Sequence, residues 1–283
     1  MNHIGIVGAG VMGRGIAQTC ASKGKTIILF DINKKALDEA FEEITMRFAK
    51  EVQKKRMTQD EMEESLARIS RTQNLGDVAK SSEVVIEAAP EDPTIKKTIF
   101  KKISEYNQEC ILASNTSSIS IDLLAEDIPN QSRVIGMHWF NPPPIMKLIE
   151  IVVGESTATQ TLTAIKELAV ELGKEPIVVK NTPGFATSRL GVALGLEAIR
   201  MVEQGVASPE DIDKAMELGY RHPMGPLKLT DYIGLDTRLR IAEYLASQNI
   251  SPAFEVPALL RKMVADGKLG RKSGEGFYKW GKS

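Results

Sequence analysis

One glycine-rich stretch near the start of the chain constrains its fold more than any other feature of the sequence. Gly8, Gly10 and Gly13 form a G-x-G-x-x-G pattern directly after the apolar run "IGIVG", and helix-spaced apolar residues follow as far as Gly24. This order predicts a strand, a tight turn and the start of a helix. Because the apolar run "TIILFD" comes next, we expect a strand–helix–strand unit within a doubly wound sheet.

Each position of the turn has a separate use in a dinucleotide site. Gly8 permits the tight turn, Gly10 lets the backbone approach a pyrophosphate, and Gly13 lets the helix pack closely on the strand. The helix begins at Val11 and Met12, where backbone amides and the positive end of the helix dipole face an anion. We therefore expect these residues to bind the cofactor.

Asp31, at the end of the second predicted strand, indicates which dinucleotide binds. Its carboxylate would accept hydrogen bonds from the ribose hydroxyls and repel the 2′-phosphate of NADP, so NAD is the predicted cofactor. The alternative is a glycine-rich turn that only packs a helix, with an aspartate at a strand end. The full strand–turn–helix–strand context favours the NAD site.

The rest of the chain separates into a β-rich part and a helical part. Strand candidates are "HIGIVG", "TIILFD", "EVVIEAA", "CILASN", "RVIGMHW", "KLIEIVV" and "PIVVK". The early runs are nearly all apolar, as expected for parallel strands covered on both faces. Residues 34–70 interrupt them with a predicted helical hairpin, whose second helix opens with the capping box Thr58-x-x-Glu61. We expect a Rossmann-type, mostly parallel sheet over residues 1–182.

After the Pro183-Gly184 step the strand signal stops, and residues 183–283 are predicted to form an all-α domain. One helix ends near Gly205, a second begins at Ser208-Pro209, and two more cover about residues 235–247 and 257–265. A helical domain of about 100 residues has a marginal ratio of surface to volume. Docking on the first domain or on a second copy of itself would help to bury its apolar faces. We therefore predict that it is a substrate and dimerisation domain and that the protein is a homodimer.

Composition excludes several classes of partner. The chain has 36 basic and 37 acidic residues, so its formal charge of −1 gives no global field toward nucleic acid or an anionic membrane. Cys20 and Cys110 are too few for a disulfide framework and are expected to be small buried thiols. With no predicted signal peptide, membrane segment or metal site, we expect a cytoplasmic protein.

The stretch "HWFNPPPIMKLIEI" places a histidine and a glutamate on either side of three prolines. If the flanking runs are antiparallel neighbours with a turn centred on Pro144, His138 and Glu150 face each other. Opposed side chains have Cβ atoms about 4.5–5.5 Å apart, which lets an imidazole and a carboxylate meet. The prolines would stiffen the turn and hold this register.

Such a pair beside a nicotinamide has a clear chemical use. Oxidation of a secondary alcohol needs a base for the hydroxyl proton, and histidine titrates near the working pH. Glu150 would fix the tautomer of His138 and stabilise the imidazolium. The alternative is a histidine that merely lies near an acid. Without the dinucleotide motif this alternative would be preferred, and with the motif the catalytic pair is favoured.

The polar run from Ser114 to Ser118 follows another predicted strand. Most such runs are loops and helix caps. At the carboxyl end of a strand in a doubly wound sheet, however, the run lies along the crevice where ligands bind. One of its hydroxyls is therefore expected to hydrogen-bond the substrate oxygen.

Six segments together resemble the 3-hydroxyacyl-CoA dehydrogenase family, most closely its short bacterial 3-hydroxybutyryl-CoA dehydrogenases. They are "GAGVMGRGIAQ", "VIEAAPED", "SNTSSISI", "HWFNPPPIMKLIEIV", "KNTPGFATSRL" and "GRKSGEGFYKW". The resemblance runs in order from Ile4 to Trp280. It implies NAD-dependent, reversible oxidation of an L-3-hydroxyacyl-CoA to the 3-ketoacyl-CoA, in fatty-acid or butyrate-type metabolism.

The resemblance also implies roles for single residues. His138 would be the general base and Glu150 its partner; Ser117 would bind the substrate 3-oxygen and lie at the cofactor, and Asn141 would lie near the nicotinamide ribose. The family also implies a basic residue on the inserted helices that meets the CoA phosphates. Lys54 is our candidate, with Lys55 and Arg56 left open.

Three further charges resemble residues that contact the cofactor in the family, namely Glu91, Lys96 and Lys272. Taken alone, each would be an ordinary solvated charge. One position departs from the family pattern, because Ser188 stands where an asparagine of the catalytic constellation is common. A serine hydroxyl is shorter and offers fewer donors than an amide. This leaves the catalytic role of Ser188 and the chain-length preference open.

Two other functions remain as alternatives. One is a related NAD-dependent dehydrogenase of a free hydroxy acid, of the gulonate type, which would need no CoA site. The other is a nucleotide-binding protein that has lost catalysis, as in crystallin-like members of the superfamily. His138, Glu150 and Ser117 together weigh against the second.

Overall fold

The computed structural model describes residues 1–281, which form two compact units, one covering Met1–Thr182 and one that begins at Pro183. The first unit contains one eight-stranded sheet. Its strands are β1 (His3–Val7), β2 (Thr26–Phe30), β3 (Ile69–Thr72), β4 (Val84–Glu87), β5 (Ile111–Ser114), β6 (Val134–Trp139), β7 (Leu148–Val153) and β8 (Glu175–Lys180).

The strands lie in the order β3-β2-β1-β4-β5-β6-β7-β8. All neighbours are parallel except β6 and β7, which are antiparallel. The order of the first six strands is that of the dinucleotide-binding fold, so the predicted Rossmann-type sheet is confirmed.

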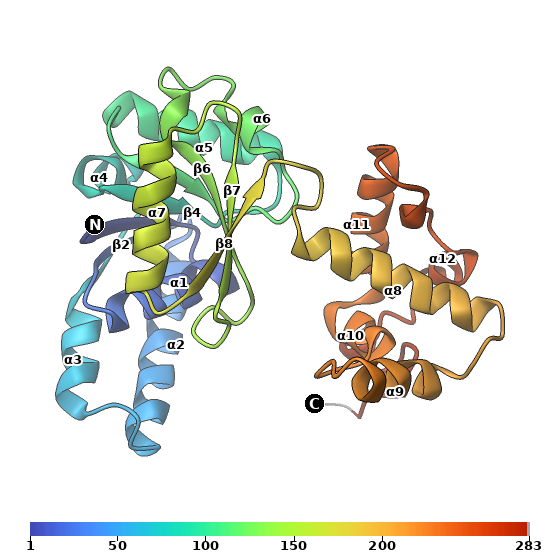
Figure 1. The fold of residues 1–283 in the computed structure, drawn as a ribbon. Coiled ribbons are helices and arrows are strands. Elements are labelled where there is room, and N and C mark those ends of the chain that lie inside the picture. Colours follow the sequence, from blue (N-terminus) through green and yellow to red (C-terminus); the bar gives the residue numbers. More distant parts are fainter. Residues whose placement is uncertain (282–283) are drawn as a thin grey trace. The chain divides into compact units, whose positions relative to one another are not determined.

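Helices cover both faces of this sheet (Figure 1). They are α1 (Val11–Ser22), α2 (Lys34–Gln53), α3 (Gln59–Ala67), α4 (Leu75–Ser81), α5 (Pro93–Tyr106), α6 (Ile121–Ala125) and α7 (Thr159–Glu171). The apolar stripes of α1 and α7 share one core with alternate strand residues such as Ile4 and Ile6. Gly5, between them, faces Val78 of α4 on the other side. The fully apolar strand runs follow from this double coverage.

The inserted helices α2 and α3 form the predicted hairpin, which Figure 1 shows projecting beyond the sheet. The Thr58–Glu61 capping box is present in both directions, since each side chain accepts from the backbone amide of the other residue. Both cysteines are free and buried, as expected. Burial raises the pKa of the Cys20 thiol to about 12.

Two elements were not predicted. Strand β3 has the sequence "ISRT", which lacks an apolar run, and we assigned its first two residues to the hairpin. It forms because its four residues pair in parallel with residues 27–30 of β2. The short helix α10 (Pro226–Ile233) lies between Gly225 and Gly234, and those glycines hid its helical pattern.

The second unit is helical, as expected. Its other helices are α8 (Thr187–Glu203), α9 (Pro209–Gly219), α11 (Leu235–Ser247) and α12 (Ala258–Ala265). Their apolar faces form one core that includes Leu196, Leu227 and Leu260. The C-terminal segment is attached through the buried Asp231, which accepts hydrogen bonds from the Phe277 and Tyr278 amides and the Trp280 indole at 2.9 Å each.

Candidate active site

The candidate residues of the first unit gather at the carboxyl ends of four neighbouring parallel strands. Val7, Glu87, Ser114 and Gly136 form one continuous row of paired residues across β1, β4, β5 and β6. The glycine turn, the Glu91 loop, the Ser114–Ser118 run and His138 each lie just beyond this row. In an open doubly wound sheet, this edge is where ligands bind.

The geometry of the glycine turn fits a dinucleotide. Gly8 has φ +103°, a conformation that L side chains rarely adopt. A Cβ on Gly13 would lie 1.7 Å from the Gly8 carbonyl oxygen, so only glycine allows the helix this close. A Cβ on Gly10 would meet no atom within 4 Å, which leaves the space in front of the α1 N-terminus open to a pyrophosphate.

Asp31 lies at the edge of a cavity of about 840 Å³. One carboxylate oxygen accepts from the Ala9 amide at 2.8 Å and the other from the Asn33 amide at 2.9 Å, which fixes the carboxylate beside the glycine turn. The cavity is walled by α5 through Ile95 and Tyr106. The cavity is also lined by Lys102 and Glu105 of α5. Its mainly apolar walls, with Asp31 beside the glycine turn, suit the adenosine end of the cofactor, and no sequence pattern indicated the α5 wall.

His138 and Glu150 are directly opposed on β6 and β7, in the register that the turn centred on Pro144 predicts. His138 Nδ1 and Glu150 Oε2 lie 2.7 Å apart, the glutamate is fully buried, and only 8% of the histidine is exposed. An ionised carboxylate can only accept a hydrogen bond, so with Glu150 ionised the imidazole proton would lie on Nδ1 and Nε2 would be the nitrogen that can accept one. The ring of Phe140 packs against the imidazole with centroids 4.5 Å apart.

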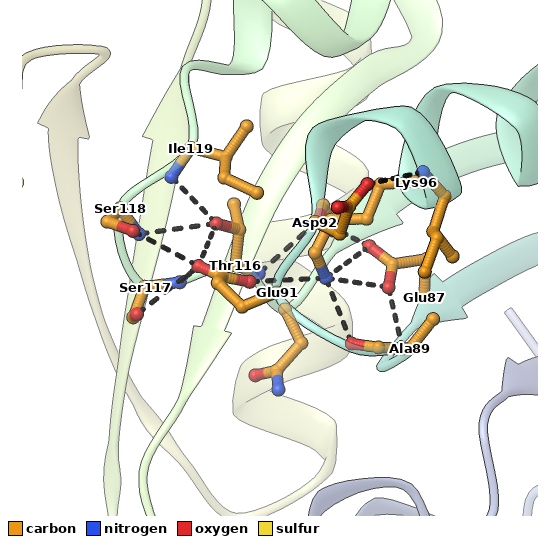
Figure 2. A network of polar contacts seen from close by, with 12 residues as sticks. Glu87, Ala89, Glu91, Asp92, Lys96, Thr116, Ser117, Ser118 and Ile119 are labelled. Carbon is orange, nitrogen blue, oxygen red and sulfur yellow. Dashed lines mark hydrogen bonds and ion pairs between the residues drawn. The ribbon is translucent and has the colours of Figure 1, made fainter. Parts of the chain in front are cut away.

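Glu91 is the centre of a hydrogen-bond network that holds the loop after β5 (Figure 2). Its Oε1 accepts from the Thr116 hydroxyl at 2.6 Å, the Ser117 amide at 2.9 Å, and the hydroxyls of Ser117 and Ser118 at 3.3 and 3.2 Å. Burial acts to raise the pKa of Glu91, but Lys96 and these donors outweigh it and hold the pKa below its ordinary value.

Lys96 connects this loop to the end of β4. Its ammonium, 1% exposed, donates to both Glu87 oxygens at 2.7 and 2.9 Å and lies 3.4 Å from Glu91 Oε2. Burial raises the pKa of the Glu87 carboxyl, although Lys96 and the Ser114 hydroxyl at 2.6 Å act in the opposite direction. Lys96 is therefore buried and paired within the protein, not solvated as its sequence context alone suggests, and its contact with the cofactor stays a prediction.

Four further candidates stand at other points of the chain. Asn141 is exposed in the turn after β6, and Lys54 ends α2, where it pairs with Glu51 at 3.7 Å. Ser188 begins α8 of the second unit, and Lys272 of the same unit pairs with Asp236 at 2.5 Å. The contacts expected of these four with ligands remain proposals.

Two residues at the site escaped the sequence analysis. Glu87 had a signal, because an acid stands inside the apolar run "EVVIEAA" and a lysine follows in the next helix. A buried acid in such a run needs a basic partner. Asn115, whose side chain accepts from the Trp139 amide at 2.9 Å and ties the β5 loop to the end of β6, had none. Trp139 lies 24 residues further along the chain, and only the order of the strands in the sheet brings it beside Asn115.

A nucleotide turn and an oriented imidazole at one sheet edge define a dinucleotide-dependent dehydrogenase. Comparison with known proteins gives the family. Residues 3–182 match the NAD-binding domain of 3-hydroxyacyl-CoA dehydrogenases, and residues 184–280 match their C-terminal domain. The chain belongs to the 3-hydroxyacyl-CoA dehydrogenase family of NAD-dependent oxidoreductases, as the six motifs indicated.

Similar proteins span the whole chain. A probable 3-hydroxybutyryl-CoA dehydrogenase of Deinococcus radiodurans is 44% identical, over 98% of this chain and 99% of its own. The mitochondrial hydroxyacyl-coenzyme A dehydrogenase of Homo sapiens is 38% identical, over 99% and 91%. The crystal structure of an (S)-3-hydroxybutyryl-CoA dehydrogenase from Ralstonia eutropha matches with a TM-score of 0.96 and 42% identity, over the full length of both chains.

No helix within residues 1–281 has both the length and the apolar composition needed to cross a membrane. Among the same residues, no cluster of three or more His, Cys, Asp or Glu side chains is arranged to hold a metal ion.

Proposed function

We propose that this protein interconverts a short-chain L-3-hydroxyacyl-CoA and the corresponding 3-ketoacyl-CoA. The first candidate substrate is 3-hydroxybutyryl-CoA. The observation that carries the proposal is the buried His138–Glu150 pair at the same sheet edge as the glycine turn. The names of the bacterial relatives support the substrate class.

Bound NAD would supply the hydride acceptor, held by the Gly8–Gly13 turn, the α1 N-terminus and Asp31. His138 Nε2 accepts the proton of the substrate hydroxyl as the alcohol is oxidised. Glu150 holds Nδ1–H at 2.7 Å, fixes the ring orientation and stabilises the positive charge that develops on the imidazole.

Ser117 would hydrogen-bond the substrate 3-oxygen, with its hydroxyl rotating away from its 3.3 Å bond to Glu91 Oε1 to do so. Glu91 holds both its amide and its hydroxyl, so the loop is already ordered before any ligand binds. The ordering of this loop lowers the entropy cost of placing the substrate. We further assign Asn141 and Lys272 to the cofactor, Lys54 to the CoA phosphates, and Ser188 to the substrate side of the site.

The test is an absorbance assay of acetoacetyl-CoA reduction with NADH and with NADPH. We expect turnover with NADH and strong preference over NADPH. His138→Ala should lower kcat by about 10²-fold or more, while NADH affinity, measured by fluorescence, stays within about twofold. An equal loss of affinity and turnover would show that His138 supports the structure instead of the chemistry.

The same assay decides between the alternatives. A rate on a free hydroxy acid with none on acetoacetyl-CoA or 3-hydroxybutyryl-CoA would establish a gulonate-type dehydrogenase. NADH binding without turnover of any substrate would establish a non-catalytic nucleotide-binding protein. We also propose a homodimer formed through the helical unit and a cytoplasmic place in fatty-acid or butyrate-type metabolism.

A further inference from the structure

The turn that joins the two strands of the His138–Glu150 pair is held by a buried lysine outside the site. This turn, residues 140–147, joins β6 to β7 and contains the three prolines. Lys174, between α7 and β8, donates from its ammonium to the Pro143 carbonyl at 2.6 Å and to the Met146 carbonyl at 2.8 Å. Only 7% of Lys174 is exposed, so its charge is bound by two backbone carbonyls of the turn instead of by water.

Lys174 is itself firmly placed. Its amide donates to Ala169 at the end of α7, and the next residue begins β8, where the Glu175 amide donates to Lys147. The ammonium also lies 5.5 Å from the centre of the Trp139 ring, directly after His138. Without hydrogen bonds to the turn, a buried ammonium would be strongly unfavourable, so the turn and the lysine hold each other in position.

Pro143 of the same turn also lies against the nucleotide helix α1. A Cβ on Gly15 would approach Pro143 Cδ to 2.8 Å and Cγ to 2.9 Å, closer than real Cβ atoms come. Gly15 lies two residues after the G-x-G-x-x-G motif and is not needed for the turn of that motif. Its lack of a side chain lets the proline ring seat on the helix whose N-terminus faces the cofactor.

We propose that Lys174 and Gly15 are positioning residues that clamp the proline turn between β8 and α1. The clamp sets the orientation of the His138–Glu150 pair relative to the N-terminal end of α1. This inference rests on the proposed function, because it assigns the clamp to the proton transfer at His138. A displacement of about 1 Å between reacting groups is enough to lower a rate by as much as about 10²-fold.

The experiment compares Lys174→Met with Lys147→Met. Both remove an ammonium near the turn, but Lys147 is exposed and pairs only with Glu175 at 3.4 Å. Lys174→Met should lower kcat for acetoacetyl-CoA about 10-fold or more, with the Kd of NADH and the KM of acetoacetyl-CoA within about twofold. Lys147→Met should leave all three unchanged.

A spectroscopic measurement separates positioning from stability. The His138 Nδ1 proton gives a downfield resonance in nitrogen-15 histidine-labelled protein, assigned by its loss in His138→Ala. In Lys174→Met we expect this proton to exchange with water about 10-fold faster, at a temperature where the variant is folded. Unchanged exchange and unchanged kcat, with only a lower Tm, would overturn the proposal.

A second pair of variants covers the case in which Lys174→Met does not fold. Gly15→Ala should crowd Pro143 and give the same loss of kcat and the same faster exchange. Adding Pro143→Ala removes the ring and should restore both, whereas failure of this rescue contradicts the clamp. The proton exchange needs no turnover, so a wild-type protein inactive on hydroxyacyl-CoA would refute the proposed function while the clamp is still tested.

Discussion

At the scale of single residues, the buried charges show most directly what this sequence must satisfy. Glu87, Glu150 and Asp231 are fully buried, and each is met by donors within 3 Å. A buried carboxylate without such partners would take up a proton or destabilise the fold. Arg238 is the exception. Within the described residues its Nε has no hydrogen-bond partner, and the residue is only 4% exposed and lies against Gly195 of α8.

We predict that Arg238→Met makes the second unit more stable, because burial of the guanidinium lowers its pKa to about 10 with no acid to offset the cost. Methionine keeps an unbranched apolar stem and removes the charge, so the free energy of unfolding should rise by about 1 kcal/mol. Denaturant unfolding measures the change.

The matched control is Arg200→Met in the same unit. Arg200 donates to the Ala253 and Glu255 carbonyls at 2.8 Å each, so its loss should be destabilising. If Arg238→Met lowers stability as Arg200→Met does, the guanidinium has an anionic partner that one chain does not supply.

At the scale of elements, the site depends on how neighbouring strand ends are tied together. The loop after β5 is held to the start of α5 by Glu91 and to the end of β6 by Asn115. The β6–β7 turn is held to α1 by Pro143 and to β8 by Lys174. Each of these contacts joins segments that no local sequence pattern connects.

The hydrogen bonds of Glu91 should contribute a stability that depends on pH. Its pKa is lowered in the folded protein, so its stabilisation is complete above the unfolded pKa of about 4.3 and is lost as the pH falls through the lower folded pKa. Urea unfolding should therefore show Glu91→Gln less stable than wild type at pH 7, with the difference shrinking below about pH 4. A difference that is constant with pH would contradict the charge-based account. Glu42→Gln, at an exposed position of α2, should have little effect at either pH.

At the scale of the whole molecule, the helical unit carries several exposed large apolar side chains. Its exposed large apolar side chains include Leu190, Val206, Leu218, Tyr220 and Tyr232, each more than half exposed. A unit of about 100 residues has little core with which to offset this. A second copy of the chain is the partner that we propose for this surface.

Light scattering after size exclusion should accordingly give twice the 31.0 kDa of one chain. Leu218→Arg, in α9, should shift the mass toward one chain, because an unpaired charge at an apolar interface is strongly unfavourable. Val170→Arg, at an exposed position of α7 in the first unit, should leave the mass unchanged. A wild-type mass of 31.0 kDa at micromolar concentration would refute the dimer.

The sequence by itself determined the parts whose cause is local. Gly8 and Gly13 predict their turn because a positive φ and a close helix–strand approach demand glycine there, and Gly10 leaves the space before the helix open. The Thr58–Glu61 box predicts its helix start because its two side chains accept hydrogen bonds from backbone amides there. Even the His138–Glu150 register followed, because a short turn fixes which residues of two adjacent strands oppose each other. The roles of the site residues stay predictions.

Only the tertiary structure decided what depends on pairing across distance. Strand β3 exists because β2 lies beside it, and Lys96 is buried because Glu87 and Glu91 converge on it. Lys174 reaches the proline turn, 28 to 31 residues earlier in the chain, because β8 runs along β7. Periodicity and motif spacing describe neighbours along the chain, whereas these contacts follow from the order of strands in the sheet.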